Sequence, residues 1–155
     1  MRTSCQFAMA VHVLAVLAYK DGDRVSSSLL ATSVNTNPVS IRRLLLVLQG
    51  ARLVETRKGA GFGSRLSRSP ARITLGEVYR AVDADKPYAL SRQPPNDQCP
   101  VGHGIRTVLE QVFGSARAAL EQELSKTTLA AVVEAVKAAS EQPARSRAGR
   151  LVQRL

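Results

Sequence analysis

The fold of this chain is decided by the stretch Val25-Ser-Ser-Ser-Leu-Leu-Ala-Thr-Ser-Val-Asn-Thr-Asn-Pro38-Val-Ser-Ile-Arg-Arg-Leu-Leu-Leu-Val-Leu48. Ser26 or Ser27 caps a first short helix, because a serine hydroxyl accepts hydrogen bonds from the free amides of the first turn. Asn37 and Pro38 begin a second helix, since asparagine caps well and proline at the first helical position loses no hydrogen bond. Two short helices joined by about three residues form a helix-turn-helix. The inward residues of the first helix are predicted to be Leu29, Leu30 and Val34.

The second helix presents two different faces. Its inward face is a stripe of apolar residues at spacings of three and four, namely Ile41, Leu44, Leu45 and Leu48. The opposite side carries Val39, Arg43 and Leu46, with Ser40 and Arg42 on the flanks. In a DNA major groove, the N-terminal half of such a helix brings Ser40, Arg42 and Arg43 to base edges and phosphates. The alternative is a solvated charged face, which the neighbouring turn and arm disfavour.

A basic, glycine-rich arm follows the second helix. The segment from Leu53 to Arg57 is predicted to be a strand that pairs with residues 64–66, and Lys58 to Gly63 is the loop between them. Three glycines in five residues permit unusual backbone angles and a close approach to a phosphate backbone. No strand–loop–helix unit carries a nucleotide-binding glycine pattern, which argues against a nucleotide site. The predicted fold is therefore mostly α, an α+β winged helix-turn-helix with a small two-stranded wing and a long C-terminal dimerisation helix.

Together these segments resemble the Rrf2 family of bacterial winged helix-turn-helix transcription regulators, the IscR/NsrR-like family. The matching segments are Ser27 to Val39, Ile41 to Leu45, Gly59 to Gly61, Leu66 to Arg68 and Ile73 to Val78. One departure is Phe62, which interrupts a glycine run that usually ends in an aromatic residue. The resemblance implies a cytoplasmic homodimer that represses transcription at a palindromic double-stranded DNA operator. Its two recognition helices are expected to lie about 34 Å apart.

The predicted DNA-binding residues come from the helix-turn-helix and the arm. Ser40, Arg42 and Arg43 are expected to contact bases or phosphates. The residues expected to fix the DNA backbone or to place the wing are Ser28, Asn37, Pro38, Arg57, Lys58, Gly61, Phe62 and Arg65. A winged-helix module that binds RNA or a protein is the alternative, because fold does not fix function. An enzyme is not expected, because the sequence shows no Ser/His/Asp set, no carboxylate pair and no metal-ligand spacing. His12 lies in an apolar helix and is predicted to be a core histidine.

The charge of the chain agrees with a polyanionic partner. Its formal net charge is +10, from 22 basic and 12 acidic residues. Nine basic residues but only Glu55 and Glu77 fall between Arg42 and Arg80. The apolar stretch from Phe7 to Ala18 is shorter than the roughly 20 residues of a membrane span, so no membrane partner is expected. Its helix is predicted to pack Phe7, Val11, Leu14 and Ala18 inward and to leave Ala10, Val13 and Leu17 for a second cover.

The second half of the chain is predicted to pair two copies. Residues 1–83 are assigned to the DNA-binding domain, 84–103 to a connecting loop, 104–142 to dimerisation helices, and 143–155 to a basic, mobile tail. The stripe expected to form the dimer interface is Ile105, Val108, Leu109, Val112, Phe113, Ala116 and Leu120. The alternative is a helix that lies across its own domain. A short helix from Leu75 to Val82 precedes the loop, and a later one from Thr128 to Ala139 turns Leu129, Val132, Val133 and Val136 inward.

The connecting loop suggests a sensor. Many members of the resembling family hold an iron-sulfur cluster through three cysteines in this loop. This chain has only Cys5 and Cys99, so neither a cluster nor another metal is predicted. Cys99 lies ahead of a helix N-terminus and near His103, which favours a thiolate that an oxidant attacks selectively. A redox sensor built from Cys99, Cys5 and His103 is therefore one hypothesis, and a cysteine that only fills space is the other.

Overall fold

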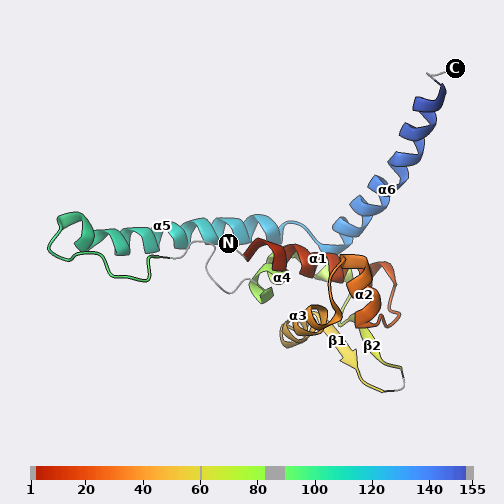
Figure 1. Ribbon diagram of the computed structural model, residues 1–155, viewed down its shortest axis with the longest axis horizontal. Helices are drawn as coiled ribbons and strands as arrows, with labels where there is room; N and C mark the ends of the chain where they lie inside the picture. Colours follow the sequence, from red (N-terminus) through yellow and green to blue (C-terminus); the bar gives the residue numbers. More distant parts are fainter. Residues whose placement is uncertain (1–2, 60, 83–89, 153–155) are drawn as a thin grey trace.

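The computed structural model describes residues 3–59, 61–82 and 90–152 of the chain (Figure 1). Helices α1 to α4 and a β-hairpin form one body, from which α5 and α6 project in different directions. The elements in chain order are α1 (Thr3–Tyr19), α2 (Ser27–Val34), α3 (Pro38–Gly50), β1 (Val54–Arg57), β2 (Gly63–Leu66), the 3-10 turn η1 (Pro70–Arg72), α4 (Leu75–Val82), α5 (Pro100–Ser125) and α6 (Leu129–Val152). This architecture confirms a mostly α winged helix-turn-helix.

The helix-turn-helix forms through the predicted caps. Ser26 accepts a hydrogen bond from the Leu29 amide at 3.2 Å and starts α2. Asn35 ends α2 in the left-handed conformation, with φ of 59°. The Asn37 side chain then accepts from the Ser40 amide at 2.9 Å, ahead of Pro38 at the start of α3. A cap of this kind is worth about 0.5–2 kcal/mol. The turn between the helices is therefore set by local sequence.

The core is formed by residues of α1, α2, α3, β1, α4 and the start of α6. The predicted stripe of α3 is buried throughout. In α1 the fully buried residues are Ala10, Val13, Leu14 and Leu17, whereas Phe7, Val11 and Ala18 are only half-buried. The predicted inward face of α1 was right at Leu14 and wrong at its other three residues, because α2, α4, α6 and β2 of the same chain surround this helix. No second copy is needed to cover Ala10, Val13 and Leu17.

Three further side chains differ from their predicted environment. Leu29 is half exposed, because α2 turns Leu30 and Ala31 into the core instead. His12 is an exposed residue whose Nε2 lies 3.2 Å from the Ser33 hydroxyl, so it is not a core histidine. Val136 is also half exposed, although it lies on the part of α6 that faces α1. In each case the helix was predicted correctly and one of its faces was not.

The hairpin is anchored by a third segment. Strands β1 and β2 are antiparallel and pair Val54 with Leu66 and Arg57 with Gly63. The backbone of Val25, between α1 and α2, exchanges two hydrogen bonds with Ser64, of 2.8 and 2.9 Å. Gly63 has φ of 127°, and a Cβ there would lie 3.1 Å from the Arg24 Cβ and the Val25 backbone. The wing therefore requires glycine at its root.

The second half of the chain departs from its predicted boundaries. The predicted short helix is confirmed as α4, but α5 begins at Pro100, which fits the first turn of a helix. The loop assigned to residues 84–103 was therefore too long at its end, and residues 84–89 lie outside the described residues. Helix α6 continues to Val152, so residues 143–152 are helical where a mobile tail was predicted. None of the described helices is long and apolar enough to span a membrane.

Candidate nucleic-acid interface

The outward side of α3 carries cations and apolar side chains together. Arg42 and Arg43 are exposed, and α3 contains no acidic residue. Val39 is 52% exposed and Leu46 is 70% exposed. The Arg42 Nε lies 3.4 Å from the Ser27 hydroxyl, which holds this guanidinium toward the start of α2. The structure therefore places Arg42 and Arg43 on a face that is open to a ligand, whereas Ser40 is half-buried.

A groove of about 690 Å³ separates α3 from the wing. It brings together four of the predicted DNA-binding residues, Arg42, Arg57, Lys58 and Phe62. The other residues that line it are Ser27, Leu45, Leu46, Gln49, Thr56, Gly63 and Ser64, so none of the lining residues is acidic. Three cations around a groove without a carboxylate make a surface that attracts phosphate.

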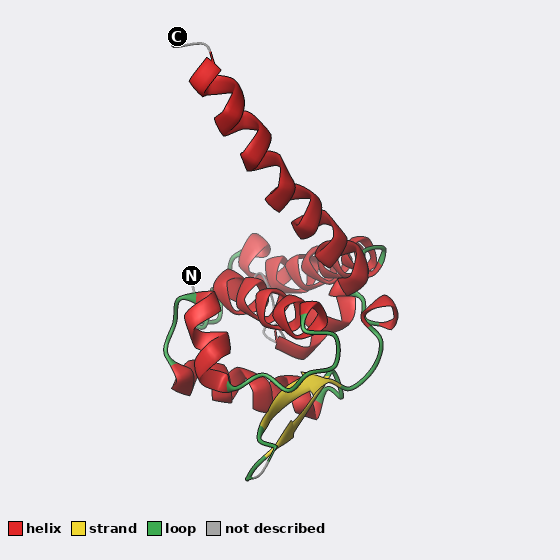
Figure 2. Cartoon of the chain, turned by 90° about the vertical axis from the view of Figure 1, so that its right-hand side faces the viewer, coloured by secondary structure: helices red, strands yellow, loops and turns green. Residues whose placement is uncertain are grey.

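The wing extends the same surface away from the body. Figure 2 shows the hairpin projecting beyond the helices. Its loop uses left-handed backbone at Gly59 and Gly61, with φ of 82° and 75°. Phe62 stands at the loop 65% exposed, in place of a further glycine. The wing loop thus offers an aromatic ring and two glycines in left-handed conformation next to Lys58.

Arg65 lies on the other face of the hairpin. Thr56 and Ser64 line the groove, and their hydroxyl groups form a hydrogen bond of 2.9 Å. The next pair along the two strands is Glu55 with Arg65. Because successive residues of a strand face opposite sides, this pair faces away from Thr56 and Ser64. Arg65 forms an ion pair with Glu55, which also accepts from Arg24 at 3.0 Å. Arg65 was predicted to help place the wing along the minor groove or its phosphates, and it is not among the residues that line the groove.

The arginines around Glu55 lower the pKa of its carboxyl group. The hydrogen bond from Arg65 lowers the pKa of Glu55 most. Burial opposes it, and the charges of Arg65, Arg24 and Arg57 lower the pKa further. Glu55 is therefore held as a carboxylate at the base of the wing. Arg24 was missed in the sequence, because a residue in the α1–α2 loop gives no local signal that it will meet a strand 31 positions away.

Cys99 occupies the N-cap of α5. Its thiol is exposed, and the backbone amides of Gly102 and Val101 lower its pKa. His103 is exposed one turn into the same helix, and Cys5 is exposed in α1. The start of α5 lies far from α1 in Figure 1, so Cys5 and Cys99 of one chain are not brought together. A Cys5–Cys99 contact requires a second copy.

The predicted interface stripe of α5 is largely uncovered in one chain. Val108 and Val112 are 54% exposed, and Ile105, Ala116 and Leu120 are exposed as well. Leu109 and Phe113 are half-buried. Only the C-terminal part of α5 packs on its own body, where Glu121 pairs with Arg80 of α4. The rest of α5 extends away from the body (Figure 1), and at its start Ile105 and Leu109 lie beside the loop that contains Pro94 and Pro95.

Comparisons with known proteins agree with this geometry. The Rrf2 family, described as an iron-dependent transcriptional regulator, matches residues 3–135. YwnA of Bacillus subtilis (strain 168), named as an HTH-type transcriptional regulator, is 38% identical over 124 residues, which are 80% of this chain and 91% of YwnA. A crystal structure described as that of a DNA-binding protein is 38% identical, with a TM-score of 0.66 over 82% of this chain and 97% of its own. IscR of T. potens shares the fold at 23% identity, with a TM-score of 0.65 over 90% of each chain.

The family description mentions iron, but this chain does not provide a matching set of metal ligands. The sequence has two cysteines, and these two lie on distant elements of one chain. Among the described residues, no three His, Cys, Asp or Glu side chains gather closely enough to hold a metal ion. The residues present do not fit an iron-sulfur cluster, which takes cysteine or histidine ligands around one site.

Proposed function

We propose that this chain, which belongs to the Rrf2 family of transcriptional regulators, acts in the cytoplasm as a homodimeric repressor at a palindromic duplex operator. The family and its named relatives are regulators of transcription and not enzymes. The observation that supports the proposal most is the basic groove between α3 and the wing, which has no acidic residue in its lining. Repression follows if the bound dimer covers a promoter.

In the proposed complex α3 enters the major groove and the wing follows the adjacent backbone. A major groove about 12 Å wide admits one helix. Arg43 lies on the outward side of α3, where its guanidinium can donate two hydrogen bonds to one guanine. Arg57 and Lys58 lie on the wing side of the groove and meet phosphates. The exposed hydroxyl of Ser28 and the Asn37 cap lie at the N-terminal ends of α2 and α3, where backbone amides attract phosphate.

The second copy is proposed to pair along α5. A stripe that includes Ile105, Val108 and Val112 is exposed in the single chain, and solvent-exposed apolar stripes of this length mark association surfaces. Twofold pairing is the commonest solution for such a surface. It places two α3 helices on one side of the dimer, which matches an operator with two half-sites.

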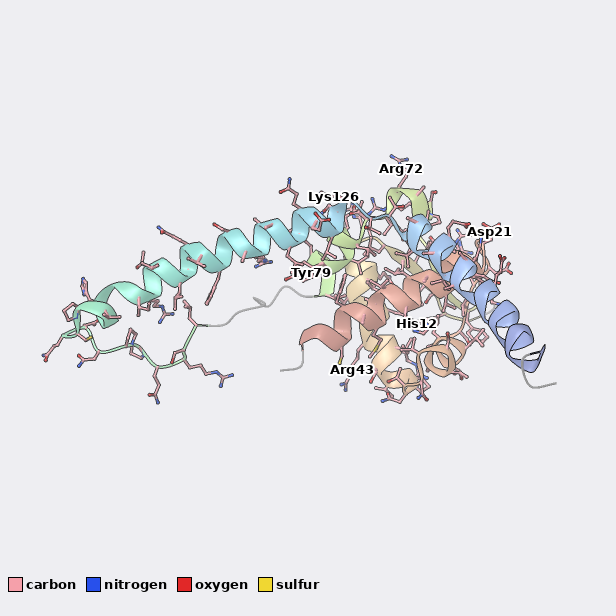
Figure 3. The ribbon with its side chains drawn as sticks, turned by 90° about the horizontal axis from the view of Figure 1, so that it is seen from above. His12, Asp21, Arg43, Arg72, Tyr79 and Lys126 are labelled. Atoms are coloured by element: carbon pink, nitrogen blue, oxygen red, sulfur yellow. The ribbon has the colours of Figure 1, made fainter. Side chains whose placement is uncertain are left out.

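A charge-matched pair of variants tests this function. Arg43→Ala and Arg72→Ala remove the same charge, and Figure 3 shows the two residues on opposite sides of the body. Arg43→Ala is expected to weaken binding to a selected operator by about 1–3 kcal/mol and binding to random duplex much less. Arg72→Ala is expected to change neither. Equal losses from both variants, or a duplex RNA that competes as well as duplex DNA, would contradict the proposal.

We also propose that the protein holds no iron-sulfur cluster and responds to oxidant or a small effector through the Cys99 loop. The support is an exposed thiol whose pKa is lowered by two backbone amides, at a helix that carries the proposed dimer stripe. In this step the thiolate attacks one oxygen of hydrogen peroxide, the S–O bond forms as the O–O bond breaks, and the sulfur becomes a sulfenic acid. Hydroxide leaves and takes up a proton from solvent to become water. A change at the start of α5 would then alter the pairing of the two α3 helices.

A further inference from the structure

The outward face of α3 is unusually apolar for a surface in water. Val39 and Leu46 are 52% and 70% exposed, and Val47 beside them is also exposed. A single exposed apolar residue is ordinary on a protein surface. Here Val39, Arg43 and Leu46 follow one another at spacings of four and three, so they form one line along the helix. The line places an arginine between two aliphatic side chains.

Charge indicates what covers this face. Arg42 and Arg43 are exposed on α3, and Arg57 and Lys58 stand across the groove from it. A protein partner would have to neutralise these cations around an apolar centre, whereas duplex DNA supplies phosphates on both sides of a groove. The floor of the major groove also offers an apolar group, the C5-methyl of thymine, which aliphatic side chains contact.

We infer that Val39 and Leu46 are specificity-determining residues that contact thymine methyl groups in the operator. This inference rests on the proposed DNA-binding function and names part of its sequence preference. Val39 lies in the first turn of α3, and Leu46 lies two turns further on, so the two side chains meet different base pairs. Arg43 between them contacts a base or phosphate in the intervening step. Each half-site then contains at least two thymines in fixed positions relative to α3.

Replacing thymine by deoxyuridine tests the inference directly. This change removes the C5-methyl and leaves every base-pairing group in place. The full-length chain first selects its duplex from a random pool, and each thymine of the half-site is then replaced in turn. Wild type is expected to lose about four-fold in affinity at each contacted position, the effect of burying one methyl group. Val39→Ala should lose its sensitivity to the methyl at one position and Leu46→Ala at another.

Val101→Ala is the matched control. Val101 is exposed on α5, away from α3, so this variant should respond to deoxyuridine as wild type does. Thermal unfolding of all three variants checks that they are folded, which is expected because each truncation is on the surface. The inference is overturned if wild type binds thymine and deoxyuridine duplexes equally at every position, or if both α3 variants keep full methyl sensitivity.

Other outcomes separate this inference from the proposed function. If a sequence is selected but its affinity does not change when any thymine methyl is removed, the DNA-binding function stands and the proposed roles of Val39 and Leu46 are wrong. The absence of any selected sequence overturns both. If Val39→Ala or Leu46→Ala instead lowers self-association in sedimentation and keeps methyl sensitivity, the face belongs to a second copy and the inference is wrong.

Discussion

The guanidinium of Arg24 donates to the carboxylate of Glu55 at 3.0 Å, although the two residues are 31 positions apart in the chain. Arg24 also donates to the Gly63 carbonyl at 3.2 Å, so one side chain holds both strands of the wing. Its side chain is 15% exposed, which shields these contacts from water. Arg24 therefore ties the wing to the α1–α2 loop.

Removing Arg24 should loosen the wing. Arg24→Ala is expected to cost about 1 kcal/mol of unfolding free energy, because the charged hydrogen bonds that it makes are partly screened by an exposed partner. Amide hydrogen exchange should rise in β1 and β2 and stay unchanged in α1. Arg72→Ala is the control for lost charge. Unchanged exchange in the hairpin would show that Arg24 does not hold it.

Gly63 and Gly114 should respond in opposite ways to alanine. Gly63→Ala should destabilise the wing, since its φ of 127° is strained for alanine and a Cβ would press on Arg24 and Val25. Gly114 lies within α5 with no atom within 4 Å of a Cβ, so Gly114→Ala should stabilise the chain by about 0.5–1 kcal/mol. Urea unfolding measures both changes. A Gly63→Ala protein as stable as wild type would contradict the account of the wing root.

Glu77 should contribute a pH-dependent part of the stability. Burial raises its pKa, but the Thr74 amide and Arg68 outweigh burial, and the pKa is lowered from 4.5. A carboxyl group with a depressed folded-state pKa stabilises the fold above its unfolded value and loses that contribution as the pH falls through the folded value. Wild type should therefore lose more stability than Glu77→Gln as the pH falls below 4.5. Parallel losses in the two proteins would exclude this contribution.

The helix-turn-helix could be predicted from sequence because its signals are local. Asn37 with Pro38, and the stripe of Ile41, Leu44 and Leu48, each specify structure within a few residues. Helix α1 is apolar on several faces, so its periodicity could not identify the face that is most buried. The Arg24–Glu55 contact is absent from any local pattern, because it depends on how the wing folds back onto the α1–α2 loop. The Arg65–Glu55 ion pair was missed for the same reason, since Glu55 lies on the opposite strand.

Cys99 should be the more reactive of the two cysteines. The amides of Gly102 and Val101 lower the pKa of Cys99, so a larger fraction of this thiol is ionised near neutral pH than for a cysteine with an ordinary pKa. Peroxide should weaken operator binding by wild type and by Cys5→Ser but not by Cys99→Ser. Mass spectrometry locates the oxidised sulfur. If Cys99→Ser responds to peroxide as wild type does, the sensor hypothesis is wrong.

Iron content tests the proposed absence of a cluster. Protein purified without oxygen is expected to contain far less than one iron per chain and to show no visible absorption from thiolate-to-iron charge transfer. The reason is that two cysteines on distant elements cannot supply the ligands of one cluster. Stoichiometric iron that is lost in Cys99→Ser would refute this proposal and assign the Cys99 loop to metal binding.

Selection of duplex DNA from a random pool by the full-length protein tests the central claim most directly. A dimer with two α3 helices should enrich an imperfect palindrome whose half-site centres lie about 10–10.5 base pairs, or a multiple of that distance, apart. The enriched duplex should bind two chains in sedimentation. A pool that gains no common sequence, or a complex that contains one chain, would contradict the account.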